Sequence, residues 1–129
     1  GEVFQTRERI DTLTAAPYAT SWLATRPLRL LDLTGSWPLR MGASHALLFA
    51  PKSTCRNWAR AICETAQRNG ETLDGMQVRS TLTGKDMPVL FAASRDAIPA
   101  APAFTSPLDG PIMFSIAAQF ASRNGWSIA

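Results

Sequence analysis

A few side chains carry the chemistry that this sequence could support: a serine at a strand end, a single histidine and two cysteines. Ser80 follows Met76 and Val78 at even spacing in a predicted strand, so its hydroxyl lies on their core-facing side. Such a hydroxyl either caps the strand end or forms the edge of a pocket, and the residues alone favour the cap. His45 has no serine–aspartate pair or metal ligands at a recognisable spacing, which favours a surface or supporting position.

Cys55 and Cys63 share the apolar face of one predicted helix. A rise of 1.5 Å per residue separates their Cα atoms by roughly 12 Å, too far for a disulfide. We therefore expect buried free thiols, which suit a reducing cytoplasm. Together with His45 they would leave a metal ion one ligand short, so we expect no metal site.

Composition and motifs exclude several function classes. The sequence lacks a phosphate-binding loop and the GxGxxG, HExxH, CxxC and GxSxG patterns. A net charge of +3, spread along the chain, permits an anionic ligand or partner but does not single out nucleic acid. No apolar run is long enough to span a membrane. The 129 residues suit one domain over 1–129, and because the chain opens on Gly1 rather than Met, we expect a domain that lacks its N-terminal part.

Periodicity and caps predict the elements that position these side chains. The clearest is a helix that begins at a cap on Ser53 or Thr54 and ends at Asn69-Gly70. We expect further helices at 2–15, 43–49 and 111–124, strands at 28–33, 76–81 and 87–93, a linker or short helix at 18–26, and an extended proline-rich connection over 94–111. Asp32, inside the first strand, requires a polar partner. Helices and short strands in this mixture predict an α+β domain.

Four segments, in this order, resemble the RES domain, a family of NAD-consuming bacterial toxins of toxin–antitoxin systems. They are residues 1–5 (GEVFQ), 26–35 (RPLRLLDLTG), 58–62 (WARAI) and 74–80 (DGMQVRS), the last with its partner strand 88–91 (PVLF). Segment 74–80 resembles the family's Asp-Gly-hydrophobic-x-x-x-Ser strand, and the resemblance covers most of the chain.

The resemblance assigns catalytic roles to Glu2 and Ser80, the family glutamate and serine, and makes Ser80 a contact to NAD. The family arginine and an accompanying tyrosine would precede Glu2, whereas Arg7 and Arg9 follow it. The implied fold is ADP-ribosyltransferase-like, with small mixed or antiparallel sheets and flanking helices. The implied activity is cleavage of the nicotinamide–ribose bond of NAD by hydrolysis, phosphorolysis or ADP-ribosyl transfer, without a metal.

The resemblance also implies a cytoplasmic protein that is neutralised by a helix-turn-helix antitoxin. Any association with nucleic acid would then be indirect, through the antitoxin. In the implied chemistry a carboxylate stabilises an oxocarbenium-like centre and the serine hydroxyl binds the ribose or the carboxamide. The residues alone also explain Glu2 as a carboxylate that the helix dipole favours in a first turn. The alternative function is a non-catalytic RES-like interaction module without the binding arginine, and a small basic nucleic-acid-binding domain ranks last.

Overall fold

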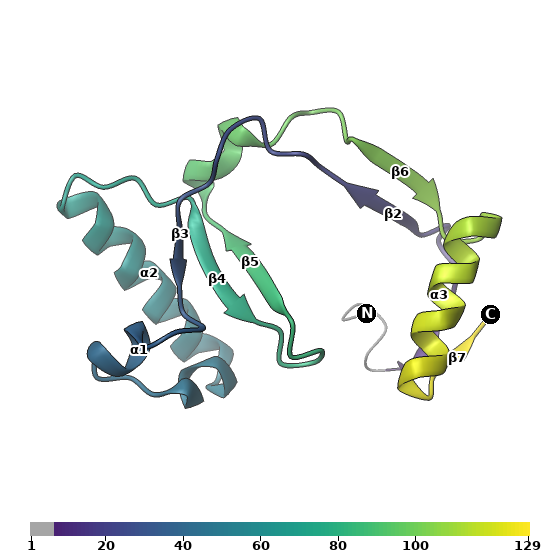
Figure 1. The fold of residues 1–129 in the computed structure, drawn as a ribbon, viewed down its shortest axis with the longest axis horizontal. Helices are drawn as coiled ribbons and strands as arrows, with labels where there is room; N and C mark the ends of the chain where they lie inside the picture. Colours follow the sequence, from purple (N-terminus) through teal and green to yellow (C-terminus); the bar gives the residue numbers. More distant parts are fainter. Residues whose placement is uncertain (1–6) are drawn as a thin grey trace. The chain divides into compact units, whose positions relative to one another are not determined.

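The computed structural model describes residues 7–129, and the chain divides into two compact units. The central unit is Ala24–Ile98, and the terminal unit joins Gly1–Leu23 to Pro99–Ala129. The described residues form helices and three small sheets, which confirms the α+β class (Figure 1). None of the described helices is long and apolar enough to cross a bilayer.

The central unit is built on a three-stranded sheet. Strand β4 (Gly75–Arg79) lies in the middle, parallel to β3 (Leu30–Asp32) and antiparallel to β5 (Asp86–Leu90). The predicted strand and hairpin are therefore confirmed, but the strand predicted for 87–93 ends at Leu90, and its last two positions begin the 3-10 helix η3 (Ala92–Ala97). Leu33, Ile62, Met76 and Val78 make the buried core between this sheet and the helices.

Helix α2 (Lys52–Arg68) confirms the most strongly patterned prediction. Its N-cap is Pro51 rather than Ser53 or Thr54, because the chain is already helical at Lys52. It ends before Gly70, whose φ of +70° suits glycine. The predicted helix at 43–49 is the tighter 3-10 helix η2 (His45–Phe49), and a short helix α1 (Trp37–Arg40), with Pro38 in its first turn, was not predicted.

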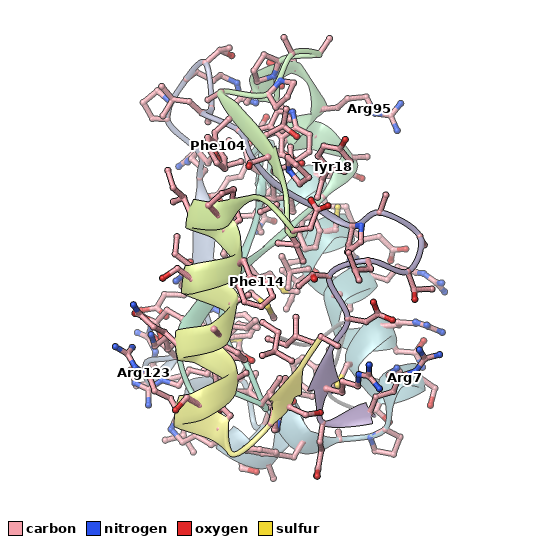
Figure 2. The ribbon with its side chains drawn as sticks, turned by 90° about the vertical axis from the view of Figure 1, so that its right-hand side faces the viewer. Arg7, Tyr18, Arg95, Phe104, Phe114 and Arg123 are labelled. Carbon is pink, nitrogen blue, oxygen red and sulfur yellow. The ribbon has the colours of Figure 1, made fainter. Side chains whose placement is uncertain are left out.

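The terminal unit holds two small sheets and one helix. Strand β2 (Tyr18–Ser21) pairs antiparallel with β6 (Phe104–Pro107), and β1 (Arg9–Ile10) pairs parallel with β7 (Ser127–Ile128). Helix α3 (Pro111–Asn124) confirms the prediction for 111–124 and ends at Gly125, with φ +68°. Ile10, Ala117 and Ala121 form a small core. Tyr18 and Phe104, from the two strands of the β2–β6 ribbon, are exposed (Figure 2).

Two predictions for the terminal unit were wrong. The helix at 2–15 is absent from its described part, because Glu8, Ala15 and Ala16 have positive φ and the Asp11 carboxylate accepts hydrogen bonds from Leu13 and Thr14 in a turn. Residues 18–26, predicted as a linker or short helix, begin with strand β2. The connection 94–111 is also less irregular than predicted, because it contains β6 and the end of η3.

Candidate functional site

Ser80 lies directly after β4 and holds the turn that leads into β5. Its side chain is buried, and its Oγ accepts hydrogen bonds from the backbone N–H groups of Leu82 (3.3 Å) and Thr83 (3.2 Å). Its main chain closes the same turn, because Ser80 N–H donates to Lys85 O and Gly84 N–H donates to Ser80 O, each at 2.8 Å. The hydroxyl therefore has the capping role that the residues alone favoured.

Ser80 also lines a cleft of about 500 Å³ in the central unit. Polar side chains and one aromatic ring share this cleft: Thr34, His45, Phe49, Arg79 and Thr81. The parallel pairing of β3 with β4 carries Thr34 to the side of Ser80, because both residues follow the ends of neighbouring strands. Ser80 is thus both the cap of the strand end and part of the edge of a pocket.

Arg79, which lines the cleft, has acidic side chains as neighbours. Arg79 lies 3.6 Å from a carboxylate oxygen of Asp86, and both side chains are exposed. Asp32 finds the polar partner that its position required: its carboxylate accepts hydrogen bonds from Thr34 N (2.8 Å) and Thr34 Oγ1 (2.6 Å). Those bonds, helped by the charge of Arg79, hold the pKa of Asp32 below its usual range. The carboxylates of Asp86 and Asp32 are therefore both neighbours of Arg79.

Helix η2 supplies His45 and Phe49 to the cleft, and its position is fixed at both ends. Ser44 Oγ accepts a hydrogen bond from Ala46 N at 3.2 Å. At the other end the Cys55 thiol, from α2, reaches Leu47 O (3.3 Å) and Ala50 O (3.5 Å). The two cysteines are free, as expected, but half-buried rather than buried. His45 is exposed, as the sequence favoured, and its place beside Ser80 was not predicted.

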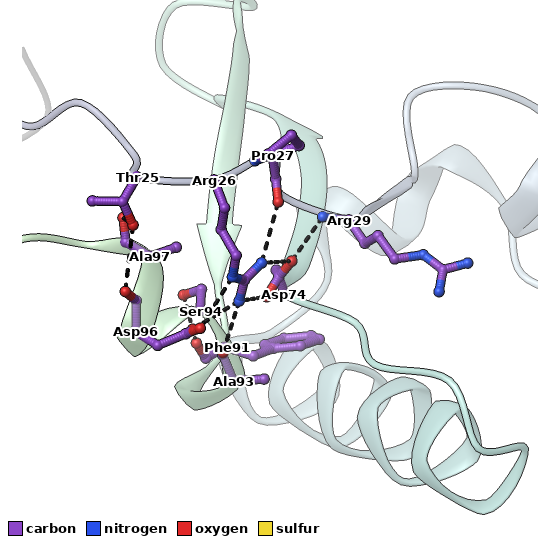
Figure 3. A network of polar contacts seen from close by, with 10 residues as sticks. All are labelled: Thr25, Arg26, Pro27, Arg29, Asp74, Phe91, Ala93, Ser94, Asp96 and Ala97. Carbon is purple, nitrogen blue, oxygen red and sulfur yellow. Dashed lines mark hydrogen bonds and ion pairs between the residues drawn. The ribbon is translucent and has the colours of Figure 1, made fainter.

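A second polar cluster joins three segments of the central unit (Figure 3). The guanidinium of Arg26 donates to both carboxylate oxygens of Asp74, at 2.9 and 2.8 Å, and to both of Asp96, at 3.1 and 2.7 Å. Arg29 N–H donates a third hydrogen bond to Asp74 at 2.8 Å. These bonds, from Arg26 above all, lower the pKa of Asp74 to about 2.

This cluster has an architectural role. The side chain of Asp74 is only 2 % exposed, and Arg26 also donates to the carbonyl oxygens of Pro27 and Ala93. A guanidinium with so many partners ties the chain before β3 to the start of β4 and to η3. Sequence reasoning missed it, because the two charges stand 48 positions apart and neither belongs to a local pattern.

The predicted site residues are only partly accounted for. Glu2 lies outside the described residues, so its distance to Ser80 is not described. Residues 7–129 contain no group of three or more histidine, cysteine, aspartate or glutamate side chains that could hold a metal ion. Comparisons with protein-family models, with curated proteins and with solved structures found no match to this chain. A function for the chain therefore rests on its own residues and their geometry.

Proposed function

We propose that this chain is a RES-like domain that binds NAD in the Ser80 cleft and breaks the bond between nicotinamide and ribose. The observation that supports this is a convergence: segments 26–35 and 74–80, which resemble the family separately, contribute Thr34 and Ser80 to one cleft. The pairing of β3 with β4 brings the two segments together, and their hydroxyls give the cavity polar groups that can bind a ribose.

The side chains of the cleft suit a dinucleotide. The hydroxyls of Thr34 and Thr81 can bind ribose oxygens, and Arg79 can pair with a diphosphate, although its position does not match the family arginine. The ring of Phe49, which is 74 % exposed, offers a face on which a base or nicotinamide can stack. The volume of about 500 Å³ falls within the range of small-molecule pockets, roughly 300–1,000 Å³.

In the proposed reaction the bond between the nicotinamide nitrogen and the ribose carbon breaks, and nicotinamide leaves as a neutral molecule. Glu2 would stabilise the positive charge that develops on the ribose. Water, phosphate or a protein side chain then forms the new bond to the ribose carbon. A helix-turn-helix antitoxin would neutralise the domain in the cytoplasm, where NAD is available.

The test is NAD consumption by the purified 129-residue chain and three variants. Ser80→Ala removes the hydroxyl from the cleft, and Ser94→Ala is its matched control, because Ser94 is a buried serine of the same unit that donates to Phe91 O at 2.8 Å. We expect Ser80→Ala and Glu2→Ala to lower turnover about tenfold or more, and Ser94→Ala to leave it within about twofold. Equal turnover in the two serine variants, at equal folded fraction, would refute the site.

A non-catalytic interaction module is the second candidate, and one observation favours it. The terminal unit exposes large apolar side chains of the kind that partners cover: Tyr18, Trp22, Leu23, Phe104, Ile112 and Ile116. The same assay separates the two candidates, because the module releases no nicotinamide even where it binds NAD. Detection of released nicotinamide that depends on Ser80 favours the enzyme.

A further inference from the structure

A cavity of about 390 Å³ lies against the apolar face of α2, separate from the Ser80 cleft. Its walls come from α2, from the segment between α2 and β4, from α1 and the residue after it, and from β3. The side chains that matter to the argument are Leu31, Trp37, Met41, Trp58, Ile62 and Glu71. Its volume is sufficient for a small organic molecule, and its lining is mostly apolar.

Two tryptophans set the chemistry of this cavity. Trp37 is half-buried, and it packs against the core of the central unit, so its position is fixed. Trp58 is half-buried as well and belongs to the apolar stripe of α2, four residues before the buried Ile62. Tryptophan faces attract cations more strongly than those of any other side chain, and sites for quaternary ammonium groups are built from them.

The charge at the cavity agrees with that chemistry. Among the described side chains that line it, Glu71 is the one ionisable group. Its nearest basic neighbour in the chain, Arg68, turns back along α2, where it donates to Glu64 O (3.5 Å) and Thr65 Oγ1 (3.3 Å). The ion pairs found among residues 7–129 involve other carboxylates, so no described basic side chain neutralises Glu71 through such a pair.

We propose that this cavity binds a small organic cation that carries methyl or other alkyl groups on its nitrogen. Trp37 and Trp58 contact the alkylated ammonium group, Leu31 and Met41 cover its apolar part, and Glu71 balances its charge. A neutral apolar ligand would make no use of Glu71, and an anion would be repelled by it. The proposal does not rest on NAD or on Ser80.

The experiment is a titration of the ¹⁵N-labelled chain with choline, followed through the four indole N–H signals in NMR spectra. Trp37 and Trp58 report on the cavity, while Trp22 and Trp126, from the terminal unit, are internal controls. The comparison ligand is 3,3-dimethylbutan-1-ol, which has the shape of choline without its charge. We expect saturable shifts of Trp37 and Trp58 with choline, and binding of the alcohol that is at least about fivefold weaker.

Variants make the test specific to the two groups invoked. Glu71→Gln should weaken choline binding about two- to fivefold, as for an exposed ion pair, whereas Glu64→Gln, on the exposed side of α2, should leave it unchanged. Trp58→Leu should weaken choline binding further. If Trp58→Leu does not fold, the comparison of Glu71→Gln with the wild type still tests the proposal, because Glu71 is exposed and its replacement leaves the core intact. Equal binding of choline and the alcohol, equal effects of the two glutamate variants, or no shift of Trp37 and Trp58 would each overturn the proposal.

Discussion

Replacement of Gly75 by alanine tests how closely β4 is held between its neighbours. Gly75 begins β4 and is paired with Leu30 of β3 and Leu90 of β5. A Cβ at this position would lie 3.1 Å from Leu30 Cδ2 and 3.1 Å from Leu90 Cα, and closer still to the carbonyl oxygen of Val89. Because two of these three atoms belong to the main chain, no side-chain rotation relieves the contact, and a strand must move.

The cost follows from that geometry. Overpacking a protein interior costs about 1–3 kcal/mol, and a contact with main-chain atoms belongs at the upper end, about 3 kcal/mol. For a domain of this size we expect the Tm of Gly75→Ala to fall by at least about 10 °C. Thermal and urea unfolding, followed by tryptophan fluorescence, measures the change, because Trp37 and Trp58 belong to the same unit as Gly75.

Gly35→Ala is the control. Its Cβ would meet only Asp32 Oδ2, at 3.6 Å, which is ordinary van der Waals contact. We expect its stability to stay within about 0.5 kcal/mol of the wild type. An unfolding midpoint for Gly75→Ala equal to that of Gly35→Ala would refute the reasoning, since the close approach of β5 to β4 would then be absent.

Two further predictions concern the charge cluster and the end of α3. Arg26 lowers the pKa of Asp74 from 3.8 to about 2, so the stabilisation from this pair is present above about pH 4 and is lost as the pH falls towards 2. The Asp74→Asn variant should therefore be less stable than the wild type at neutral pH, and its free energy of unfolding should fall less between pH 4 and pH 2 in urea titrations. Equal losses of unfolding free energy in the two proteins would contradict this. Gly125→Ala should lower the stability of the terminal unit by about 1 kcal/mol, because φ there is +68°, and an unchanged Tm would count against it.

Local signals explain what the sequence predicted well. Helix α3 has Pro111 in its first turn and Gly125 after its last residue, and its apolar residues recur at helical spacing. The β4–β5 hairpin closes through a glycine, Gly84, with φ +68°. Each of these features can be recognised within about fifteen residues. The structure differs from the prediction only in the residues at which some of these helices and strands begin or end.

Pairings between distant residues explain what the sequence did not predict. Tyr18 and Pro107 are partners in the β2–β6 ribbon, and Arg9 and Ser127 pair in β1–β7. Strands this short carry little periodicity, and their partners lie near opposite ends of the chain. For the same reason a single sequence could not place His45 in the Ser80 cleft.

Segment 74–80, one of the four that resemble the RES family, has a structural explanation at three of its positions. Asp74 binds Arg26, Gly75 fits where a Cβ would meet Val89 O, and Ser80 closes the turn after β4. Folding alone could therefore require this pattern, so the pattern by itself is weak evidence for catalysis.

The feature of the cleft that goes beyond this pattern is the pair of solvent-open side chains at its edge, Phe49 and Arg79, which a bound molecule can contact. Ser80→Ala should destabilise the turn whether or not the domain is an enzyme, because two backbone N–H groups lose their acceptor. Loss of stability therefore does not distinguish a cap from a catalytic serine, and only the rate of nicotinamide release per folded molecule does.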